Sequence, residues 1–444
     1  MVTGKRSESV KQIYRFPLKQ HIGVAAAPTI VEGDNIVRGQ LLAFREKETL
    51  GANIYSSVSG VVSKISETEI IIEADEKQTK EYLPLRQETP LALIEEAGIV
   101  GLGGAGFPTY AKLQNPLPQD GVVIVNAVEC EPILGHNIVA IEKNPVQLIR
   151  GLQIVMDVVK VEKGIIAIKE IHTKAIEGLQ GALADDRIRI VKLPNLYPMG
   201  EERAIIRETL GVLLGVESLP SEAHAIVINA ETTCRIQEAV DLKKPLIDKN
   251  ITVAGKLKGN ENLIRIFEDV PIGISVGDMF EQAGGLADSY GELIMGGPFT
   301  GKRTSLDAPV IKTTGGLIAA ECFMKGPERI GILVCACGAD KTRLEQIAES
   351  MGSEVVGVEY CKQAHPVKSS LKCENPGRCP GQVQKVLALK KAGAQAVLIS
   401  NCTDCSNTVM SCAPQLGLPV YHCTDGALRA VNKKLVRRIK EEKS

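Results

Sequence analysis

The sequence predicts a multidomain α/β protein with four parts, and three observations support this fold class. Short apolar runs separated by turn residues fill the first part, and apolar runs alternate with helical patterns in the second and fourth. Ten of the twelve cysteines lie between Cys322 and Cys423. The expected order is a β barrel-sandwich (1–85), an α/β domain (86–242), a β-grasp insert (243–325) and a Cys-rich parallel α/β domain (326–444).

The N-terminal part has the turn spacing of a small barrel. Gly33 and Gly39 interrupt the run VEGDNIVRGQLLAF, and YSSVSGVVSKI and EIIIEA add two further strand patterns. The pattern resembles biotinyl and lipoyl domains, which carry a cofactor on a lysine at a hairpin tip. Lys47 is the candidate lysine, but its neighbours match no modification motif, so we expect a structural barrel without a cofactor.

The composition excludes several classes of protein. The net charge is −1 and aromatic residues make up 3% of the chain, which argues against a nucleic-acid partner. The first residues, MVTGKRSESVKQIYRF, lack the apolar core of a signal peptide, and no apolar run reaches the roughly 18 residues of a membrane span. We therefore expect a cytoplasmic protein with reduced cysteines that are free to bind metal or exchange electrons.

The cysteines of the last part follow predicted strands. GILVCA places Cys335 and Cys337 at one strand end, EVVGVEY places Cys361 at the next, and AVLIS and LPVYH precede Cys402 and Cys423. The carboxyl ends of parallel strands share one sheet edge, so these cysteines should converge there. Seven cysteines are candidates to hold an iron–sulfur cluster or zinc, or to work as dithiol/disulfide pairs: Cys335, Cys337, Cys361, Cys373, Cys379, Cys402 and Cys405.

Within this group we expect Cys402 and Cys405 to be catalytic. Their C-x-x-C spacing lies between a strand and a helix, whose N-terminus favours a thiolate and lowers the thiol pKa. They are the expected electron exit, whereas Cys412 should pack within the helix. A further helix from ALRAVNKKLVRRIKEE should close the chain.

A glycine loop opens the second part. GLGGAGFPTYAKL contains G-x-G-x-x-G at Gly101, Gly103 and Gly106, but a helical pattern precedes it and Pro108 follows, which disfavours an ordinary dinucleotide fingerprint. Glycines still let the backbone approach a phosphate or a flat ring, and Lys112 would add a positive charge. Polar clusters follow at NAVECEP, YPMGEERAII and INAETTCRI, two of them at the ends of apolar strands.

These motifs resemble a known family. The chain resembles the flavoprotein subunit of respiratory complex I, which binds NADH and FMN, in four motifs: GLGGAGFPT, NAVECEP, GEE and NAET. The resemblance to the RnfC component of the Rnf electron-transport complex is closer and covers about residues 14–320, from PLKQHIG to PVIKTTGG. The Cys-rich C-terminal part looks like that of the electron-transfer protein associated with proline reductase (PrdC-like) in anaerobes that ferment amino acids.

The resemblance implies a set of cofactor contacts. For FMN they are Gly101, Gly103, Gly104, Lys112, Asn126, Glu129 and Asn229, with Gly106 in the same loop. For NADH they are Phe107, Glu129, Glu201 and Glu202, with Glu129 also assigned a catalytic role. The chain departs from the family at Val128, where complex I has an acidic residue, and in lacking two C-x-x-C-x-x-C-x-x-x-C-P motifs.

The expected function is electron transfer from NADH through FMN and the C-terminal cysteines to a partner reductase, such as proline reductase. Peripheral docking on a membrane complex, as in the Rnf relatives, stays open. One alternative is a cobalamin reductase, although those proteins carry the ferredoxin motifs. Another is a non-catalytic scaffold, in which the flavin domain is degenerate and the cysteines hold structural zinc.

Overall fold

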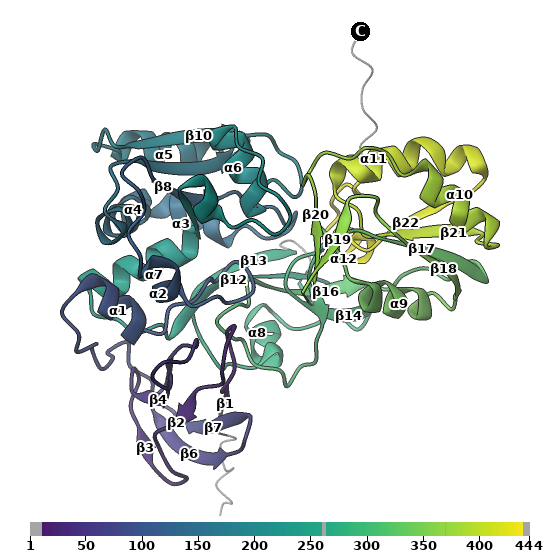
Figure 1. Cartoon of the computed structure of the whole chain (residues 1–444). Coiled ribbons are helices and arrows are strands. Elements are labelled where there is room, and N and C mark those ends of the chain that lie inside the picture. Colours follow the sequence, from purple (N-terminus) through teal and green to yellow (C-terminus); the bar gives the residue numbers. More distant parts are fainter. Residues whose placement is uncertain (1–10, 260–262, 369, 438–444) are drawn as a thin grey trace, which may run out of the picture.

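The computed structural model describes residues 11–259, 263–368 and 370–437, which form four units in chain order (Figure 1). The first ten residues, from which we predicted the absence of a signal peptide, lie outside this part. Among the described residues, no helix combines the length and apolar character needed to cross a membrane.

Two small antiparallel sheets form the N-terminal barrel-sandwich. Burial alternates along the strand at Glu69–Ala74, where Ile70, Ile72 and Ala74 face the core, as expected for a strand with one buried face. The larger sheet has the order β1 (Ile13–Pro17), β7 (Glu69–Ala74), β6 (Gly60–Ile65), β3 (Asn35–Ile36). The smaller sheet contains β2 (Ala27–Pro28), β4 (Leu41–Phe44) and β5 (Ile54–Tyr55).

A four-stranded parallel sheet with helices on both faces forms the second unit. The strands at Val122–Ala127 and Gly164–Lys169 are buried almost throughout, which is why they appear in the sequence as continuous apolar runs. Their order is β10 (Ile188–Leu193), β9 (Gly164–Lys169), β8 (Val122–Ala127), β11 (Ala225–Asn229). The helices are α1 (Pro90–Glu96), α2 (Thr109–Leu113), α3 (His136–Lys143), α4 (Pro145–Val159), α5 (Thr173–Ala182), α6 (Glu202–Leu210) and α7 (Ala230–Asp241), with a 3-10 turn at Pro220–Ala223.

The third unit has the strand order of a β-grasp. Its order is β13 (Ile264–Pro271), β12 (Asp248–Gly255), β16 (Gly316–Glu321), β14 (Tyr290–Met295), β15 (Lys302–Arg303). The first and last long strands, β12 and β16, run parallel at the centre, and helix α8 (Val276–Gln282) connects the two halves. The predicted β-grasp is therefore present.

A second parallel sheet forms the C-terminal unit. Its order is β18 (Glu354–Tyr360), β17 (Arg329–Val334), β21 (Ala396–Ile399), β22 (Val420–His422). Its helices are α9 (Lys341–Ser350), α10 (Val383–Lys391), α11 (Thr403–Cys412) and α12 (Asp425–Ala430), with a 3-10 turn at Pro414–Leu416. A hairpin of β19 (Ala364–Val367) and β20 (Ser370–Cys373) projects from this sheet.

The predicted closing helix is shorter than expected. Helix α12 ends at Ala430, and Asn432 takes a left-handed conformation with φ of 55°, which stops an α-helix. Lys433 then donates a hydrogen bond to the carbonyl of Pro132 in the second unit. The end of the predicted helix lies outside the described residues. The predicted boundaries at 85, 242 and 325 fall between elements and stay predictions.

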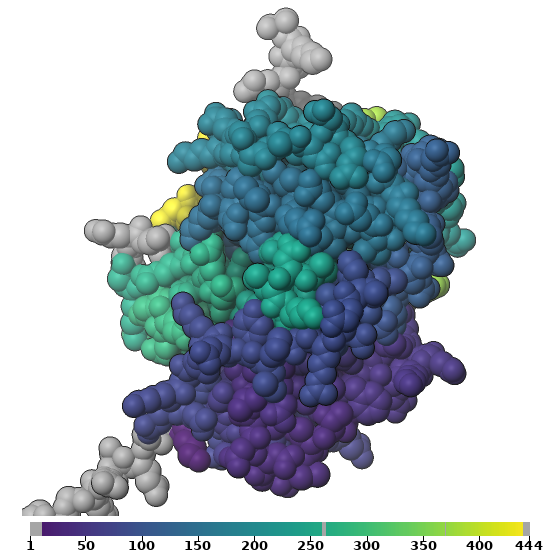
Figure 2. All heavy atoms as spheres, turned by 90° about the vertical axis from the view of Figure 1, so that its left-hand side faces the viewer, coloured from purple at the N-terminus to yellow at the C-terminus, as the bar shows by residue number. Residues whose placement is uncertain are grey.

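Shared apolar clusters and polar contacts join the four units. Arg38 of the barrel forms an ion pair with Asp248 of the β-grasp at 2.6 Å, and Arg343 of α9 forms one with Glu292 of β14. Arg207 of α6 donates to the carbonyl of Pro376 in the C-terminal unit at 2.8 Å. From the side, Figure 2 shows the purple barrel beneath the blue-to-teal second unit, with the green β-grasp beside both.

Candidate functional site

Two asparagines mark the carboxyl edge of the second sheet. Asn126 in β8 and Asn229 in β11 are register partners in neighbouring parallel strands. The side chain of Asn229 caps α7 by accepting from the backbone N–H groups of Glu231 and Thr232. The Asn126 side chain donates to the carbonyl of Gly200 at 2.9 Å. Both amides are held rigidly where a ligand is expected in an open α/β sheet.

The glycine loop passes over this edge between α1 and α2. A Cβ on Gly103 would lie 2.3 Å from the Asn229 side-chain nitrogen, so only glycine fits there. A Cβ on Gly104 would meet no atom within 4 Å, because this residue faces open space. The preceding element is a helix, as predicted, and so the loop is not a strand-initiated dinucleotide fingerprint.

A cavity of about 910 Å³ opens between the loop and the sheet edge, a volume typical of cofactor sites. Six of the predicted cofactor residues line it: Gly103, Gly104, Asn126, Glu129, Glu201 and Asn229. The exposed backbone at Gly104 and the two fixed amides suit the phosphate and ring edge of a flavin, so the residues present fit FMN.

Other predicted contacts lie outside the cavity lining. Lys112 donates to the Glu202 carboxylate and to the carbonyl of Val227, at 2.8 and 2.9 Å. Its ammonium is therefore already paired, and the Glu202 carboxylate is occupied in the same contact. Gly101, Gly106 and Phe107 belong to the loop but do not line the cavity either. Their roles as cofactor contacts stay predictions.

The acidic residues of the cavity have different environments. Glu201 accepts from the backbone N–H groups of Arg203 and Ala204 and pairs with the Arg203 guanidinium, so it caps α6. Burial raises the pKa of Glu129 to about 7, although Lys169 opposes the shift. Its oxygens accept from the Glu131 backbone and, at 3.4 Å, from Asn137. The pKa of Glu129 therefore lies close to neutral pH.

Sequence reasoning missed Glu131, Tyr197 and Phe299. Glu131 accepts hydrogen bonds from the backbone of Phe299 and from Thr300, and so joins the second unit to the β-grasp. Phe299 stacks on Tyr197 with ring centroids 3.6 Å apart, and the Tyr197 hydroxyl donates to the carbonyl of Cys337. Glu131 could have been noted from its place in NAVECEP, but no local signal pairs Tyr197 with Phe299.

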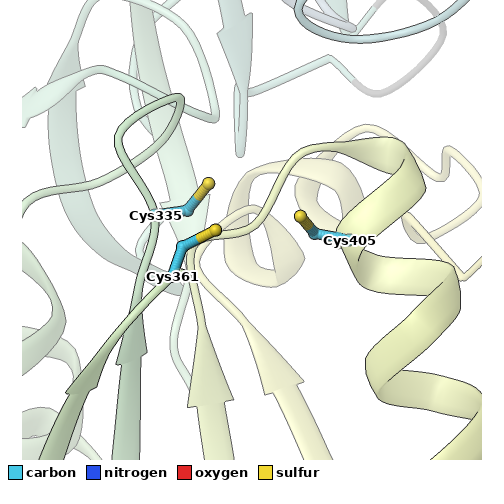
Figure 3. Close-up of side chains that lie close together, drawn as sticks. All are labelled: Cys335, Cys361 and Cys405. Atoms are coloured by element: carbon cyan, nitrogen blue, oxygen red, sulfur yellow. The ribbon is translucent and has the colours of Figure 1, made fainter. Parts of the chain in front are cut away.

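The seven candidate cysteines form one connected group in the C-terminal unit. The sulfurs of Cys335, Cys361 and Cys405 all lie within 4.8 Å of one another and point to a common centre (Figure 3). Contacts between thiols extend the group: Cys335 with Cys337 and Cys402, Cys405 with Cys379, and Cys337 with Cys373. The predicted convergence at the sheet edge is therefore present, with Cys373 and Cys379 added from the hairpin and the following loop.

Two expectations about individual cysteines were wrong. Cys423 directly follows β22 but packs in the core, where its sulfur lies 3.5 Å from His422, so it does not join the group. The thiols of Cys402 and Cys405 have raised pKa values, because hydrogen bonds to Cys335 hold their protons. The pKa is lowered instead at Cys335, whose sulfur accepts those hydrogen bonds, and at Cys373 and Cys379. Cys412 packs in the helix as predicted.

Polar groups around the cysteines fit a bound metal or cluster. Gln382 is 1% exposed and its amide N–H lies 3.1 Å from the Cys361 sulfur and 3.4 Å from that of Cys379. The Asn401 side chain is fully buried beside Cys402, and none of its polar atoms has a partner. Amide groups that point at metal-bound sulfur commonly stabilise iron–sulfur clusters, so the donor set suits such a centre.

The flavin site and the cysteine group share a wall. Cys337 and Cys373 line the same cavity as Gly103, Gly104 and Asn126. Residues of the β-grasp complete the lining, among them Gly296, Gly297 and Thr314. The arrangement is that of a redox protein in which a flavin domain and a thiol-rich centre face each other.

Comparison with known families agrees with this class. Residues 94–238 match the family described as the Nuo51 FMN-binding domain, and residues 6–80 match the RnfC barrel sandwich hybrid domain. The C subunit of the proton-translocating ferredoxin:NAD(+) oxidoreductase complex from Clostridium ljungdahlii is 33% identical over 323 residues, which cover 68% of this chain and 69% of the relative. The chain belongs to the RnfC family of Rnf electron-transport complexes.

Two further relatives show the range of the family. The C subunit of the Na(+)-translocating ferredoxin:NAD(+) oxidoreductase complex from Acetobacterium woodii is 31% identical over 348 residues, 74% of this chain and 76% of the relative. The cobalamin reductase PduS of Salmonella typhimurium is 37% identical over 226 residues, 51% of this chain and 48% of the relative. These findings agree on a redox role and on an FMN-binding domain.

Proposed function

We propose that this chain is an NADH-dependent electron-transfer flavoprotein that passes electrons from its FMN site to the C-terminal cysteines and then to a partner reductase. The observation that supports this most directly is the cavity shared by the glycine loop and the cysteines Cys337 and Cys373. FMN, when bound, accepts a hydride and returns the electrons singly or as a pair.

The residues around the cavity have distinct tasks in this proposal. The backbone of Gly103 and Gly104 approaches the phosphate and the ring, while Asn126 and Asn229 orient the ring edge through fixed amides. Glu129, with a pKa of about 7, holds or releases a proton beside the nucleotide. We expect Glu201 and Glu202 to disfavour the extra phosphate of NADPH, although Arg203 and Lys112 pair with their carboxylates in the structure.

The cysteines supply the route to the partner. Five of them, which we call the inner set, are Cys335, Cys361, Cys379, Cys402 and Cys405, and we propose that they hold an iron–sulfur cluster. Cys379 is partly exposed in the loop after β20, so it offers an exit to the surface. Proline reductase, expected from the resemblance, is one candidate acceptor, and peripheral docking on a membrane complex is another way to reach a partner.

Anaerobic purification followed by flavin, iron and sulfide analysis tests the proposal. We expect bound FMN, iron with sulfide, and bleaching of the flavin absorbance by NADH at much lower concentration than by NADPH. A colourless protein with tightly bound zinc would instead support a scaffold. The similarity to PduS favours a second candidate function, that of a cobalamin reductase. Faster turnover with a cob(II)alamin acceptor than with proline reductase would support this second candidate.

The glycine loop provides a sharper test. Gly104→Val should abolish FMN binding, because its side chain projects into the cavity without disturbing any protein atom. Gly181→Val in α5 is the matched control, since a Cβ there also meets nothing within 4 Å and lies far from the cavity lining. The measurement is the FMN content of the two purified variants. Full flavin in Gly104→Val would place the site elsewhere.

A further inference from the structure

Two of the seven cysteines are set apart from the inner set. Cys337 and Cys373 line the flavin cavity, whereas the inner cysteines do not. Cys337 lies in the turn that follows β17, and Cys373 ends β20, where hairpin pairing with Ala364 holds it. The hairpin therefore carries Cys373 to the cavity wall, next to a cysteine 36 positions away in the chain.

The two thiols are neighbours of each other and of the inner set. The Cys337 side chain makes hydrogen bonds with both Cys373 and Cys335. The Cys373 sulfur also donates weakly to the Gln363 side chain, at 3.6 Å. A continuous series of sulfur contacts thus runs from the cavity wall through Cys337 to the inner set. Because an iron–sulfur cluster takes four cysteine ligands, the inner set suffices without this pair.

We propose that Cys337 and Cys373 are a redox-active pair, a disulfide when oxidised, that stands between the flavin cavity and the inner cysteines; the inference rests on the function proposed above. On reduction the bond between the two sulfurs breaks, two electrons and two protons are taken up, and two thiols form. The reductant is the dihydroflavin of the proposed function, which loses the same electrons and protons and returns to its oxidised form. Reoxidation reverses the change and releases the electrons toward the inner set and the partner.

Disulfide mapping on the full-length protein tests the pairing directly. The anaerobically purified chain is treated with the thiol oxidant diamide, free thiols are alkylated, and the tryptic peptides are analysed. We expect peptide 330–341 linked to peptide 373–378, and a loss of the link after dithiothreitol. Because the first peptide carries both Cys335 and Cys337, fragment ions between them must place the bond at Cys337.

Two further measurements separate a redox pair from metal ligands. Cys337→Ser and Cys373→Ser should retain the iron of the wild type but take up about one two-electron equivalent per chain less in a dithionite titration. Cys412→Ser, outside the group, should match the wild type in both. A proportional loss of iron in either variant, or a chain that forms no link between these residues, would overturn the proposal. Dithionite replaces NADH here, so a failure of NADH to bleach the flavin would count against the proposed function alone.

Discussion

At the scale of single residues, burial changes the chemistry of Glu129. It follows a buried strand, and enclosure beneath the cavity raises its pKa to about 7, above the value of 4.5 for an ordinary glutamate. The carboxyl is therefore neutral below this pH and anionic above it. A neutral Glu129 can donate a hydrogen bond to a nucleotide oxygen, whereas the anion repels the phosphates.

The raised pKa of Glu129 predicts that nucleotide binding depends on pH. NADH affinity should fall as pH rises through about 7, by a factor of roughly three to ten over two pH units. Glu129→Gln should bind with little pH dependence, since its amide does not titrate in this range. Quenching of NADH fluorescence measures the dissociation constants. Glu142→Gln, at an exposed position of α3, serves as the control. If the dissociation constant of Glu129→Gln changed with pH as steeply as that of the wild type, this would falsify the assignment of the pH dependence to Glu129.

At the scale of elements, Lys312 joins the barrel, the end of α1 and the β-grasp. Its side chain is 1% exposed, and its ammonium donates to the carbonyls of Asn53 and Gly98 at 2.5 and 2.7 Å. Its backbone N–H donates to Gln20 in the barrel. Burial lowers the pKa of Lys312 to about 7 from 10.5. The charged form is thus disfavoured in the folded state relative to the unfolded chain.

Lys312→Met should destabilise the protein by about 1–3 kcal/mol, because two buried carbonyls lose their donor. The sign of the pKa shift also predicts how this difference changes with pH. The unfolded chain binds more protons at Lys312 between pH 7 and 10.5, so the advantage of the wild type should grow across that interval. Unfolding temperatures of both proteins over this range provide the measurement. A difference that does not depend on pH would contradict the shift.

At the scale of the whole molecule, three units meet above the cysteine group. Tyr197 from the second unit stacks on Phe299 from the β-grasp, and both pack against the C-terminal cysteines. The backbone of Tyr197 exchanges hydrogen bonds with Thr403 at the start of α11. The position of the cavity relative to the cysteines is therefore set by packing between units, not by any single element.

The cysteines at the start of α11 should be needed for the metal but not for the flavin. A Cys402→Ser, Cys405→Ser double variant should lose most of its iron and its transfer to the natural acceptor, while its FMN content stays equal to that of the wild type. Cys412→Ser, ten residues after Cys402 in the same helical segment, is the matched control. Transfer to the acceptor at the wild-type rate would show that the exit lies elsewhere.

The sequence by itself determined the classes of the four units and one edge of each parallel sheet. Continuous apolar runs followed by Asn126, Cys335 or Cys361 were sufficient to predict the strands and the edge at which they end. The reason is that a parallel strand is buried on both faces and its carboxyl end lies at the ligand-binding edge. This rule locates the strand end but not the direction of each side chain. Cys423 therefore follows its strand as predicted and yet packs in the core.

Only the tertiary structure decided what the predicted residues contact. Lys112 had the sequence context of a phosphate ligand, but a salt bridge with Glu202 occupies it, and these residues are 90 positions apart. Cys373 reaches the flavin cavity because a hairpin and a second unit pack together, and local patterns of residues carry no information about such distant pairings. Burial and neighbouring thiols then set the pKa values: the pKa of Cys402 is raised, where a lowered value was expected, and that of Cys335 is lowered.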